Sequence, residues 1–467
     1  MSECKNVIDF RIDANTYKKD YLKTEAIIQT KGFKTVEELS VSVQNFGAYS
    51  LCNFINFTDE GIPFLMTENV RHNFIDWNIQ KYVDLQSHEM LYKSHCRKGQ
   101  VLVTMAGEYL GRVAVYDKDF VCSSNQAIAK VTLSSQQNPY IISTFLNTRY
   151  GQNQINRLKT ITGQPNINMS LIKSLKILAF SSDFSKAIEN TINKSEQKRE
   201  QSKQKYTQAE NLLLQEIGLQ DFTPSEEAVN IKSFKESFGI SGRLDAEYYQ
   251  VKYEQIVEKI KSQKHSSLVS LVNISKSIEP GSAYYSDEKG LPFYRVSDYN
   301  KFGLSQPDKE LTNSFITDNK ELIEQLKPKK GTILFSKDGS VGTAYLLRED
   351  LDGITSGAIL HLQVKNTKEI LPEYLTLALN SKLVQMQAER DAGGSIILHW
   401  RVSEIENVVV PIISYNKQQQ ISKMVEESFR LKQESEQLLE TAKQAVEIAI
   451  EESEEIAMKY IDANGSK

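Results

Sequence analysis

The sequence of 467 residues is poor in the features that mark secreted, membrane-spanning and zinc-binding proteins. Its four cysteines all lie in the first half and none forms a CxxC pair, which excludes a disulfide framework and a zinc signature. No run approaches the roughly 20 apolar residues of a membrane-spanning helix, and the opening MSECKNVIDFRID lacks the apolar core of a secretory signal. We therefore expect a cytosolic protein with reduced, structural thiols and no membrane contact.

The common catalytic and cofactor-binding motifs are absent as well. The chain has no GxGxxG dinucleotide loop, no GxxxxGKS phosphate loop and no HExxH helix. Its six histidines are scattered, and His95 beside Cys96 makes a poor dyad because neighbours in sequence usually point apart. The sequence thus predicts a protein with no catalytic residues, no bound metal and no cofactor of its own.

What the sequence does contain is a long internal repeat. Four segments of the first half return in the same order in the second half: RIDANTY (11–17) as RLDAEYY (243–249), GIPFLMTENV (61–70) as GLPFYRVSDY (290–299), KGQVLVTMAG (98–107) as KGTILFSKDG (330–339), and NPYIISTFLNT (138–148) as LPEYLTLALNS (371–381). The period of about 230 residues is the size of a domain and too long for a solenoid repeat. The chain therefore holds two homologous modules in tandem.

A long polar helix is expected after each module. Apolar and small residues recur there at spacings of three and four, which indicates a heptad seam for a partner helix. The first seam comprises Ile188, Ile192, Ser195, Arg199, Ser202, Tyr206, Ala209, Leu213 and Ile217. The second comprises Ile421, Val425, Ser428, Ser435, Leu439, Ala442, Val446, Ala449 and Ile456.

The charges of these two helices are complementary. The first is basic in its middle, from Lys194 to Lys205, and the second is acidic from Glu434 to Glu455. We expect the helices to pack on each other in antiparallel orientation, although a charge run alone is also typical of a solvated helix face. A helix over residues 185–217 measures about 48 Å at 1.5 Å per residue. One turn of DNA measures roughly 34 Å, so the helix pair can act as a ruler between the modules.

Within each module the pattern predicts an α+β fold. Alternating segments such as QVLVTM (100–105) and TILFSK (332–337) predict strands that are mixed with helices. The expected organisation is a first module over residues 1–183, a central helix over 184–220, a linker over 221–242, a second module over 243–415, a C-terminal helix over 416–459 and a tail over 460–467.

Charge is unevenly distributed in the first module, although the net charge of the chain is −4. Residues 120–182 contain no Asp or Glu, and their basic residues are Lys130, Arg149, Arg157, Lys159, Lys173 and Lys176. A surface that faces DNA phosphates has such a composition, and so does a buried polar segment with a few solvated lysines. The equivalent stretch of the second module contains acids, so the DNA-facing interpretation applies to the first module only.

Taken together, these features resemble the specificity subunit of type I restriction-modification enzymes. The resemblance is strongest in the second half, whose ordered motifs are KGTIL (330–334), PEYLTLALNS (372–381), Gly393-Gly394 and QQQI (418–421). The first half departs from the pattern, because its glycine loop reads TGQP (162–165) and its helix entry lacks the Gln run. The resemblance implies two target recognition domains that each read one half of a bipartite, asymmetric DNA sequence, with the helices as an antiparallel coiled coil that fixes the gap.

The resemblance also implies the partners. The chain would be a non-catalytic subunit bound to double-stranded DNA and to two methyltransferase subunits, and it stays open whether restriction or translocase subunits join them. Methyl transfer from S-adenosylmethionine would belong to the methyltransferase partner, so no cofactor is expected in this chain.

Candidate DNA-contacting residues lie on polar loops, because Arg, Lys, Asn, Gln and Ser side chains read base edges and hold phosphates. In the first module they are Arg157, Lys159, Thr160, Thr162, Gln164, Asn166 and Asn168, followed by Asn69, Arg71, His72 and Asn73. In the second module they are Arg390, Ser395, His399, Trp400 and Arg401, followed by Asp298, Tyr299, Asn300 and Lys301. For each of them an ordinary role in a polar loop is the alternative.

Two other functions stay open on the residues alone. A structural adaptor would bind proteins through its modules and use the coiled coil as an assembly stalk. The recognition portion of a single-chain restriction-methylation enzyme would need catalytic domains that this sequence lacks. Salt separates the adaptor from a DNA reader, because neutralised phosphates release counterions and make DNA binding steeply salt-dependent.

Overall fold

The computed structural model describes residues 13–47, 49–160, 163–227, 229–286, 288–394 and 396–465. The chain forms two compact units: unit 1 contains Met1–Glu200 with Lys432–Lys467, and unit 2 contains Gln201–Leu431. Both boundaries fall inside long helices, α7 (Ser182–Glu216) and α16 (Tyr415–Glu451). Each unit therefore combines one module with its own stretch of both helices.

Unit 1 is built on two four-stranded sheets. The larger sheet is antiparallel, with the order β2-β9-β6-β7, and the smaller has the order β3-β5-β4-β8. The strands are β1 (Phe33–Thr35), β2 (Ser40–Gln44), β3 (Phe57–Thr58), β4 (Ile62–Leu65), β5 (Tyr82–Val83), β6 (Val101–Thr104), β7 (Val113–Val115), β8 (Ser123–Ser124), β9 (Ile128–Leu133) and β10 (Lys176–Leu178). The helices beside them are α1 (Lys19–Lys31), α2 (Val36–Leu39), α3 (Leu85–Met90), α4 (Pro139–Asn147), α5 (Arg149–Leu158) and α6 (Met169–Lys173).

Unit 2 repeats this arrangement. Its sheets have the orders β12-β21-β18-β19 and β13-β17-β14-β20. The strands are β11 (His265–Ser267), β12 (Val272–Lys276), β13 (Tyr285–Ser286), β14 (Leu291–Tyr294), β15 (Tyr299–Asn300), β16 (Gly303–Leu304), β17 (Glu310–Leu311), β18 (Ile333–Ser336), β19 (Ala344–Leu346), β20 (Ile354–Thr355), β21 (Ile359–Val364) and β22 (Val409–Pro411). The helices are α8 (Phe238–Ser241), α9 (Val251–Lys261), α10 (Leu268–Leu271), α11 (Asn313–Asp318), α12 (Lys320–Leu326), α13 (Pro372–Asn380), α14 (Lys382–Asp391) and α15 (Val402–Glu406).

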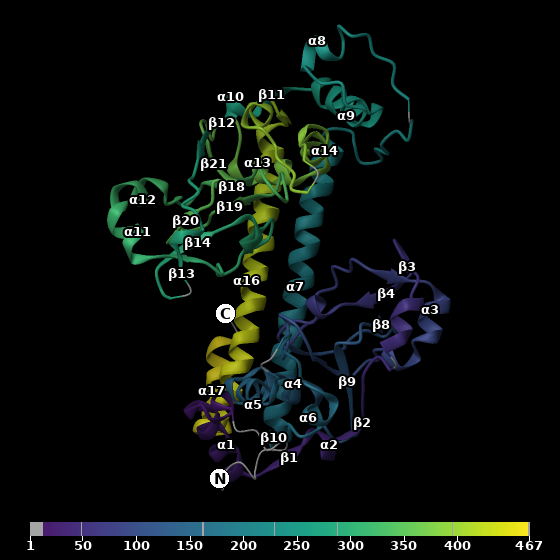
Figure 1. Ribbon diagram of the computed structural model, residues 1–467, viewed down its shortest axis with the longest axis vertical. Coiled ribbons are helices and arrows are strands. Elements are labelled where there is room, and N and C mark those ends of the chain that lie inside the picture. Colours follow the sequence, from purple (N-terminus) through teal and green to yellow (C-terminus); the bar gives the residue numbers. More distant parts are fainter. Residues whose placement is uncertain are drawn as a thin grey trace. The chain divides into compact units, whose positions relative to one another are not determined.

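The two modules share one topology. In both, the larger sheet is antiparallel, the smaller one contains a single parallel pair (β4 with β8, β14 with β20), and a short two-stranded sheet joins β1 to β10 or β11 to β22. The strands predicted over 100–105 and 332–337 are β6 and β18. Figure 1 shows β18, β19 and β21 beside α13 in unit 2. The mixed α and β fold with two tandem homologous modules, predicted from the sequence, is confirmed.

The repeated glycines have a local reason. Gly111 and Gly342 adopt positive φ angles of 88° and 80°, which L side chains rarely adopt. The side chain of Gln152 donates to the Gly111 carbonyl over 2.8 Å, and that of Gln385 donates to the Gly342 carbonyl over 2.8 Å. A Cβ on Gly342 would lie 2.9 Å from the Gln385 amide nitrogen. Each glycine thus lets the turn between β6 and β7, or between β18 and β19, contact a helix of its own unit, α5 or α14.

Each unit has its own hydrophobic core, which includes its stretch of the long helices. In unit 1 the buried residues include Phe145 of α4, Ile188 of α7 and Val446 of α16. In unit 2 Tyr206 of α7 and Val425 of α16 belong to the core of that unit. In the part of the chain that the structure describes, no helix has both the length and the apolar character needed to cross a membrane.

The predicted antiparallel pairing of the long helices holds in unit 1. The Ser195 hydroxyl of α7 lies 2.9 Å from the Ser435 hydroxyl of α16, and the Lys198 ammonium group lies 2.7 Å from the Glu434 carboxylate. Residue numbers rise along α7 as they fall along α16, so the helices run in opposite directions. The pairing follows the expected charge complementarity, since α7 supplies the lysine and α16 the glutamate.

The same orientation holds in unit 2. Ser202 of α7 and Ser428 of α16 have their hydroxyls 3.1 Å apart, and Glu216 pairs with Lys417 over 2.8 Å. The predicted seam of α7 is buried throughout except at Arg199, whose side chain is 12% exposed.

The predicted single C-terminal helix is divided into two. α16 ends at Glu451, and α17 (Glu454–Asn464) begins after Ser453, whose hydroxyl accepts a hydrogen bond from the Ile456 N–H over 3.3 Å. Ile456 was assigned to the seam but is 43% exposed, whereas Ala457 is buried. That prediction was wrong because a heptad spacing does not register a capped break between two helices.

Candidate nucleic-acid interface

Glycine loop 1, residues 159–168, connects α5 to α6 in unit 1. The Gly107 N–H donates to the Pro165 carbonyl over 3.0 Å, and the Ile167 N–H donates to the Met105 carbonyl over 2.8 Å. These bonds fasten the loop to the segment that follows β6. The rigid central sheet therefore positions a loop whose tip is free to contact a ligand.

Glycine loop 2, residues 392–401, is its counterpart between α14 and α15 in unit 2. The Gly339 N–H donates to the Leu398 carbonyl over 2.9 Å, and the Trp400 N–H donates to the Lys337 carbonyl over 2.7 Å. The attachment point is the segment after β18, which corresponds to the segment after β6. The structure thus places the two loops that the sequence singled out at equivalent positions in the two modules.

The tip of glycine loop 1 is exposed and polar. Gln164 and Asn166 are both exposed, while Thr160 closes the loop: its N–H donates to the Asn166 carbonyl over 2.9 Å and its hydroxyl accepts from the Asn166 N–H over 3.1 Å. Thr162 lies outside the described residues. Gln164 and Asn166 therefore present amides that can donate to and accept from a base edge.

Two further candidates of glycine loop 1 have local structural partners. The Asn168 side chain caps α6 by accepting from the Leu171 N–H over 2.9 Å. The Lys159 ammonium group donates to the Asn156 side-chain oxygen over 2.8 Å. Asn168 acts mainly as a helix cap, and Lys159 stays half-buried beside α5.

Glycine loop 2 exposes one imidazole and one guanidinium group. The His399 Nδ1 atom lies 2.9 Å from an Asp338 carboxylate oxygen, and the ring is 63% exposed. The Arg401 side chain is 70% exposed and pairs with Glu404 over 2.9 Å. Ser395 lies outside the described residues. His399 and Arg401 remain available for a DNA contact.

Two candidates in unit 2 are corrected by their burial and partners. Trp400 is 1% exposed, with its ring 5.7 Å from that of Phe335, so it cannot reach a base edge. The Arg390 guanidinium group pairs with Asp391 over 2.6 Å, and that carboxylate is 6% exposed. Sequence alone did not distinguish these residues from exposed loop residues, because Phe335, which packs on Trp400, and Tyr248, whose ring centre lies 5.2 Å from the Arg390 guanidinium group, come from distant segments.

Glycine loop 2 also exposes an apolar tip that the sequence analysis missed. Ile396, Ile397 and Leu398 are 94%, 54% and 42% exposed. The sequence shows them as three successive apolar residues shortly after Gly393 and Gly394. Apolar side chains in this position can contact the methyl group of thymine, which Gln164 and Asn166 of loop 1 cannot do in the same way.

Most of the remaining candidates lie on two other loops, here named docking loop 1 (residues 70–75) and docking loop 2 (residues 299–304), and Asn69 and Asp298 stand directly before them. Asn73 is buried with φ at 65°, and its side-chain oxygen accepts from Ser143 over 3.0 Å and from Asn147 over 2.8 Å. Asn73 is thus a structural residue and the DNA assignment was wrong, because its amide is consumed inside unit 1.

Arg71 and Asn300 have local partners too. The Arg71 guanidinium group lies 3.9 Å from Asp76. The Asn300 side chain accepts a hydrogen bond from the Phe302 N–H over 2.8 Å, which closes its own turn. The docking loops also bring Phe74 and Phe302 onto the long helices, while the assignment of Arg71 and Asn300 to DNA stays a prediction.

The acid-free segment, residues 120–182 of unit 1, has basic residues that pair with carboxylates outside the segment. The partners of its basic residues are Glu25 for Arg157 and Lys176, Glu37 for Lys173, and Glu447 with Glu451 for Arg149. Burial alone would raise the pKa of Glu25, but hydrogen bonds from Lys176 and Gln29 and the nearby cations outweigh it and lower that pKa. The interpretation of this segment as a phosphate-facing surface is therefore corrected for these four cations.

Lys130, another cation of that segment, is buried in the sheet at 1% exposure. Its ammonium group donates to the Ser124 hydroxyl over 3.1 Å, and burial lowers its pKa to about 8. The same sheet position in unit 2 holds His361, whose Nε2 atom lies 2.8 Å from the Thr355 hydroxyl and whose pKa burial lowers to about 4. Neither nitrogen can face a phosphate.

Comparison with known proteins gives a family match in the second module. Residues 263–443 match the family described as the type I restriction modification DNA specificity domain. No curated protein sequence gives a match to the chain. The match covers less than half of the chain, and it includes glycine loop 2, docking loop 2 and most of unit 2.

Similar solved structures extend over both halves. The S subunit of a type I restriction-modification system from M. genitalium is 16% identical, with 92% of this chain and 95% of that chain covered and a TM-score of 0.39. The HsdS subunit from Thermoanaerobacter tengcongensis is 12% identical, with 93% and 96% covered and a TM-score of 0.26. These TM-scores are low, and the solved structures carry no argument here.

Proposed function

We propose that this chain, whose residues 263–443 match the type I restriction modification DNA specificity domain, is a DNA sequence-recognition subunit that reads a split, asymmetric DNA target. The observation that carries the proposal is the shared topology of the two modules: the family match lies on the second, and the first repeats its strand order. Because the loops of the two modules differ, each would read a different half of the target.

Glycine loops 1 and 2 are the parts of the modules that we propose for base reading. Both are fastened to the end of the central hairpin and both have exposed tips. Gln164 and Asn166 would read one half-site through amide hydrogen bonds, and His399 and Arg401 the other half-site through charged or aromatic donors. Arg390, Trp400 and Asn73 have no part in this proposal, because the fold uses their side chains.

The partners in this proposal are double-stranded DNA and methyltransferase subunits, two of them if each half-site needs one. Methyl transfer and the binding of S-adenosylmethionine would belong to those subunits, so this chain would supply recognition without catalysis and without a cofactor. Whether restriction or translocase subunits join the complex stays open. Its place of action would be the cytoplasm, where the DNA lies.

A structural adaptor that binds only proteins is not favoured, because the matched family is a DNA specificity domain. A mobility assay of the complex on duplex DNA tests the difference. The DNA reader should lose affinity steeply as salt rises from about 50 to 200 mM, since each neutralised phosphate releases counterions. An affinity without salt dependence would support the adaptor.

Sequencing of methylated bases in cells that express the chain with its methyltransferase gives the decisive test. A single split motif with two different halves is expected. The variant Gln164→Ala with Asn166→Ala should relax one half only, and Gln136→Ala, at an exposed residue of the turn before α4, is the matched control. An unbroken motif, or none, would contradict the proposal.

A further inference from the structure

Docking loops 1 and 2 contact the long helices through cations stacked on aromatic rings. We infer that these contacts hold each module in one orientation on its helix pair and thereby set how strictly the gap between the two half-sites is kept. The inference rests on the proposed function. It assigns a positioning role to Phe74 and Phe302, and to Lys301, which the sequence alone had placed on DNA.

In unit 1 the helix supplies the cation and docking loop 1 supplies the ring. The Arg199 guanidinium group of α7 lies 3.5 Å from the centre of the Phe74 ring. Arg199 is itself fixed, because it pairs with Glu196 over 2.6 Å and donates to the Ser435 hydroxyl of α16 over 3.3 Å. Arg199 is thus bonded to residues of both long helices in addition to its contact with docking loop 1.

Docking loop 1 is equally well fixed on its other side. The Asn73 N–H donates to the Val113 carbonyl of β7 over 2.8 Å, and the Asn73 side chain bonds to Asn147 of α4. Val70 and Ile75 close the loop through a backbone bridge. Docking loop 1 thus forms a short, hydrogen-bonded connection from the central sheet of unit 1 to α7. Phe74 is the residue of this loop that contacts the helix.

In unit 2 the roles are exchanged. The Lys301 ammonium group of docking loop 2 lies 3.0 Å from the Glu210 carboxylate and 5.0 Å from the centre of the Tyr206 ring, both on α7. The Phe302 ring meets the Tyr206 ring edge-on, with centres 5.0 Å apart. Here the module supplies the cation and the helix supplies the ring and the carboxylate.

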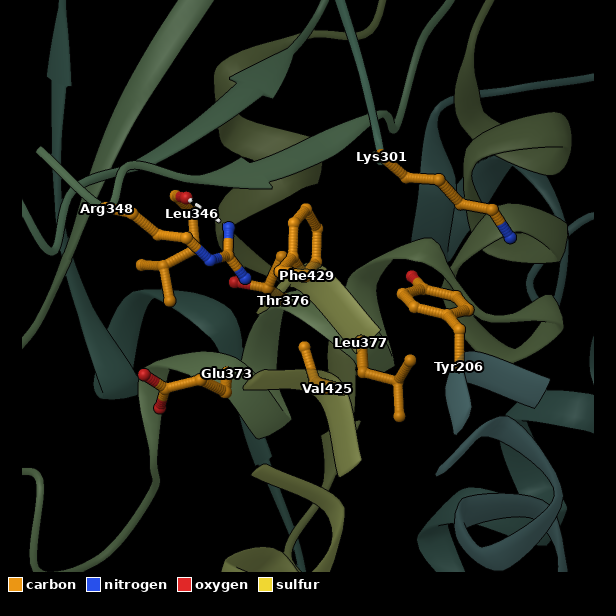
Figure 2. Close-up of a pocket in the computed structure, with 9 residues that line it drawn as sticks. All are labelled: Tyr206, Lys301, Leu346, Arg348, Glu373, Thr376, Leu377, Val425 and Phe429. Carbon is orange, nitrogen blue, oxygen red and sulfur yellow. Dashed lines mark hydrogen bonds between the residues drawn. The ribbon is translucent and has the colours of Figure 1, made fainter. Parts of the chain in front are cut away.

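A second contact of this kind joins unit 2 to α16. The Arg348 guanidinium group lies 3.3 Å from the centre of the Phe429 ring and donates to the Leu346 carbonyl over 3.0 Å. Figure 2 shows the Arg348 and Phe429 side chains facing each other in a pocket that Tyr206 and Lys301 also line. Module 2 is therefore held to α7 and to α16 at separate points.

These cations are engaged within the protein, which argues against a phosphate role for them. Cation–π contacts are stronger where they are desolvated, and the Arg199 side chain is only 12% exposed. Removal of the Phe74 ring would expose the Arg199 guanidinium group and remove the contact that holds docking loop 1 on α7. Because one base pair occupies about 3.4 Å along the DNA axis, a small rotation of a module suffices to change the tolerated gap by one base pair.

The test uses the full chain with its methyltransferase and a plasmid library in which the two half-sites are separated by the parental gap, one base pair fewer, or one more. Phe74→Ala removes the ring under Arg199, and Phe302→Ala removes the ring that meets Tyr206 edge-on and lies 5.1 Å from the Lys301 ammonium group. We expect methylation at the altered gaps, normalised to the parental gap, to rise about fivefold, the equilibrium equivalent of losing one cation–π contact. The bases of both half-sites should stay the same.

Controls separate positioning from folding. Phe74→Tyr and Phe302→Tyr keep an aromatic face and should keep the parental gap profile, as should Phe54→Ala at a ring that is 69% exposed. If an alanine variant loses methylation at every gap, Phe74→Leu or Phe302→Leu replaces it: a broadened profile supports the inference and a parental profile overturns it.

The result also distinguishes this inference from the proposed function. A parental chain that methylates no split motif would sink the proposed function. A parental chain with a sharp split motif, together with ring-deleted variants whose gap profile is unchanged, would leave the proposed function standing and overturn the positioning role.

Discussion

At the scale of single residues, the same residue type has different roles in this chain according to what surrounds it. Arg401 is 70% exposed and pairs with Glu404 of the next helix at the surface, whereas Arg199 lies under the ring of Phe74 and Arg157, which is 12% exposed, pairs with Glu25. Residue type and loop position therefore identified candidates for DNA contact, but burial and partners selected among them. Gln164, Asn166, His399 and Arg401 are among the candidates that keep exposed side chains.

Trp400 tests that selection. Trp400→Ala should lower the free energy of unfolding by about 3 to 5 kcal/mol, because it removes a large buried ring, as measured by urea denaturation. Trp400→Phe should retain most of the stability and the parental DNA affinity. A folded Trp400→Phe variant with an affinity reduced about tenfold or more would show that the indole contacts DNA after all.

His361 makes a pH-dependent contribution to stability. Burial lowers its pKa from 6.5 to about 4, so the unfolded chain takes up a proton at a higher pH than the folded one. The stability that neutral His361 contributes is complete above about pH 6.5 and is lost as the pH falls toward 4. In His361→Gln, which keeps a partner for Thr355, the loss of stability over this range should be smaller by about 3 kcal/mol.

Denaturation midpoints at several pH values between 4 and 7 measure this effect. The matched control is His265→Gln, at an exposed histidine of the same unit. Equal pH dependence in the parent and in His361→Gln would contradict the assignment of a neutral buried imidazole.

At the scale of elements, the long helices behave as their pattern predicted, with one exception. The serines in the middle of the seam are buried and bonded to each other, as Ser195 is to Ser435, so the polar middle is an interface and not a gap. The exception is the break at Ser453, where a serine cap starts a new helix. A cap of one residue does not alter a periodic spacing that spans several turns. The spacing alone therefore did not reveal the break.

The Lys198 and Glu434 pair tests the antiparallel register of these helices. Lys198→Glu should destabilise unit 1 by about 1 kcal/mol, because it places two carboxylates together near a helix surface. The double variant Lys198→Glu with Glu434→Lys should recover most of that loss in thermal denaturation. No recovery in the double variant would mean that the two side chains do not meet.

At the scale of the whole molecule, the duplication is the feature that gives the protein two readers. Replacing the first module, residues 13–181, by that of another specificity subunit should change one half of the methylated motif and leave the other half and the gap unchanged. Methylome sequencing measures this directly. A change in both halves would show that the modules do not read independently.

The sequence by itself determined the duplication, the mixed α and β fold, the two long helices and the family resemblance. All of these depend on repeated motifs or on periodic spacing, which a linear chain displays without being folded. It also located both glycine loops, because glycine, proline and polar residues mark turns by their own backbone preferences.

Only the tertiary structure decided which residues of those loops are exposed and what the docking loops do. The partners of Arg157, Asn73, Trp400 and Phe74 come from segments far away in the chain. Pairing between distant segments produces no periodic pattern in a single sequence. A cation that contacts a ring of its own unit therefore cannot be distinguished from one that faces DNA until the chain is folded.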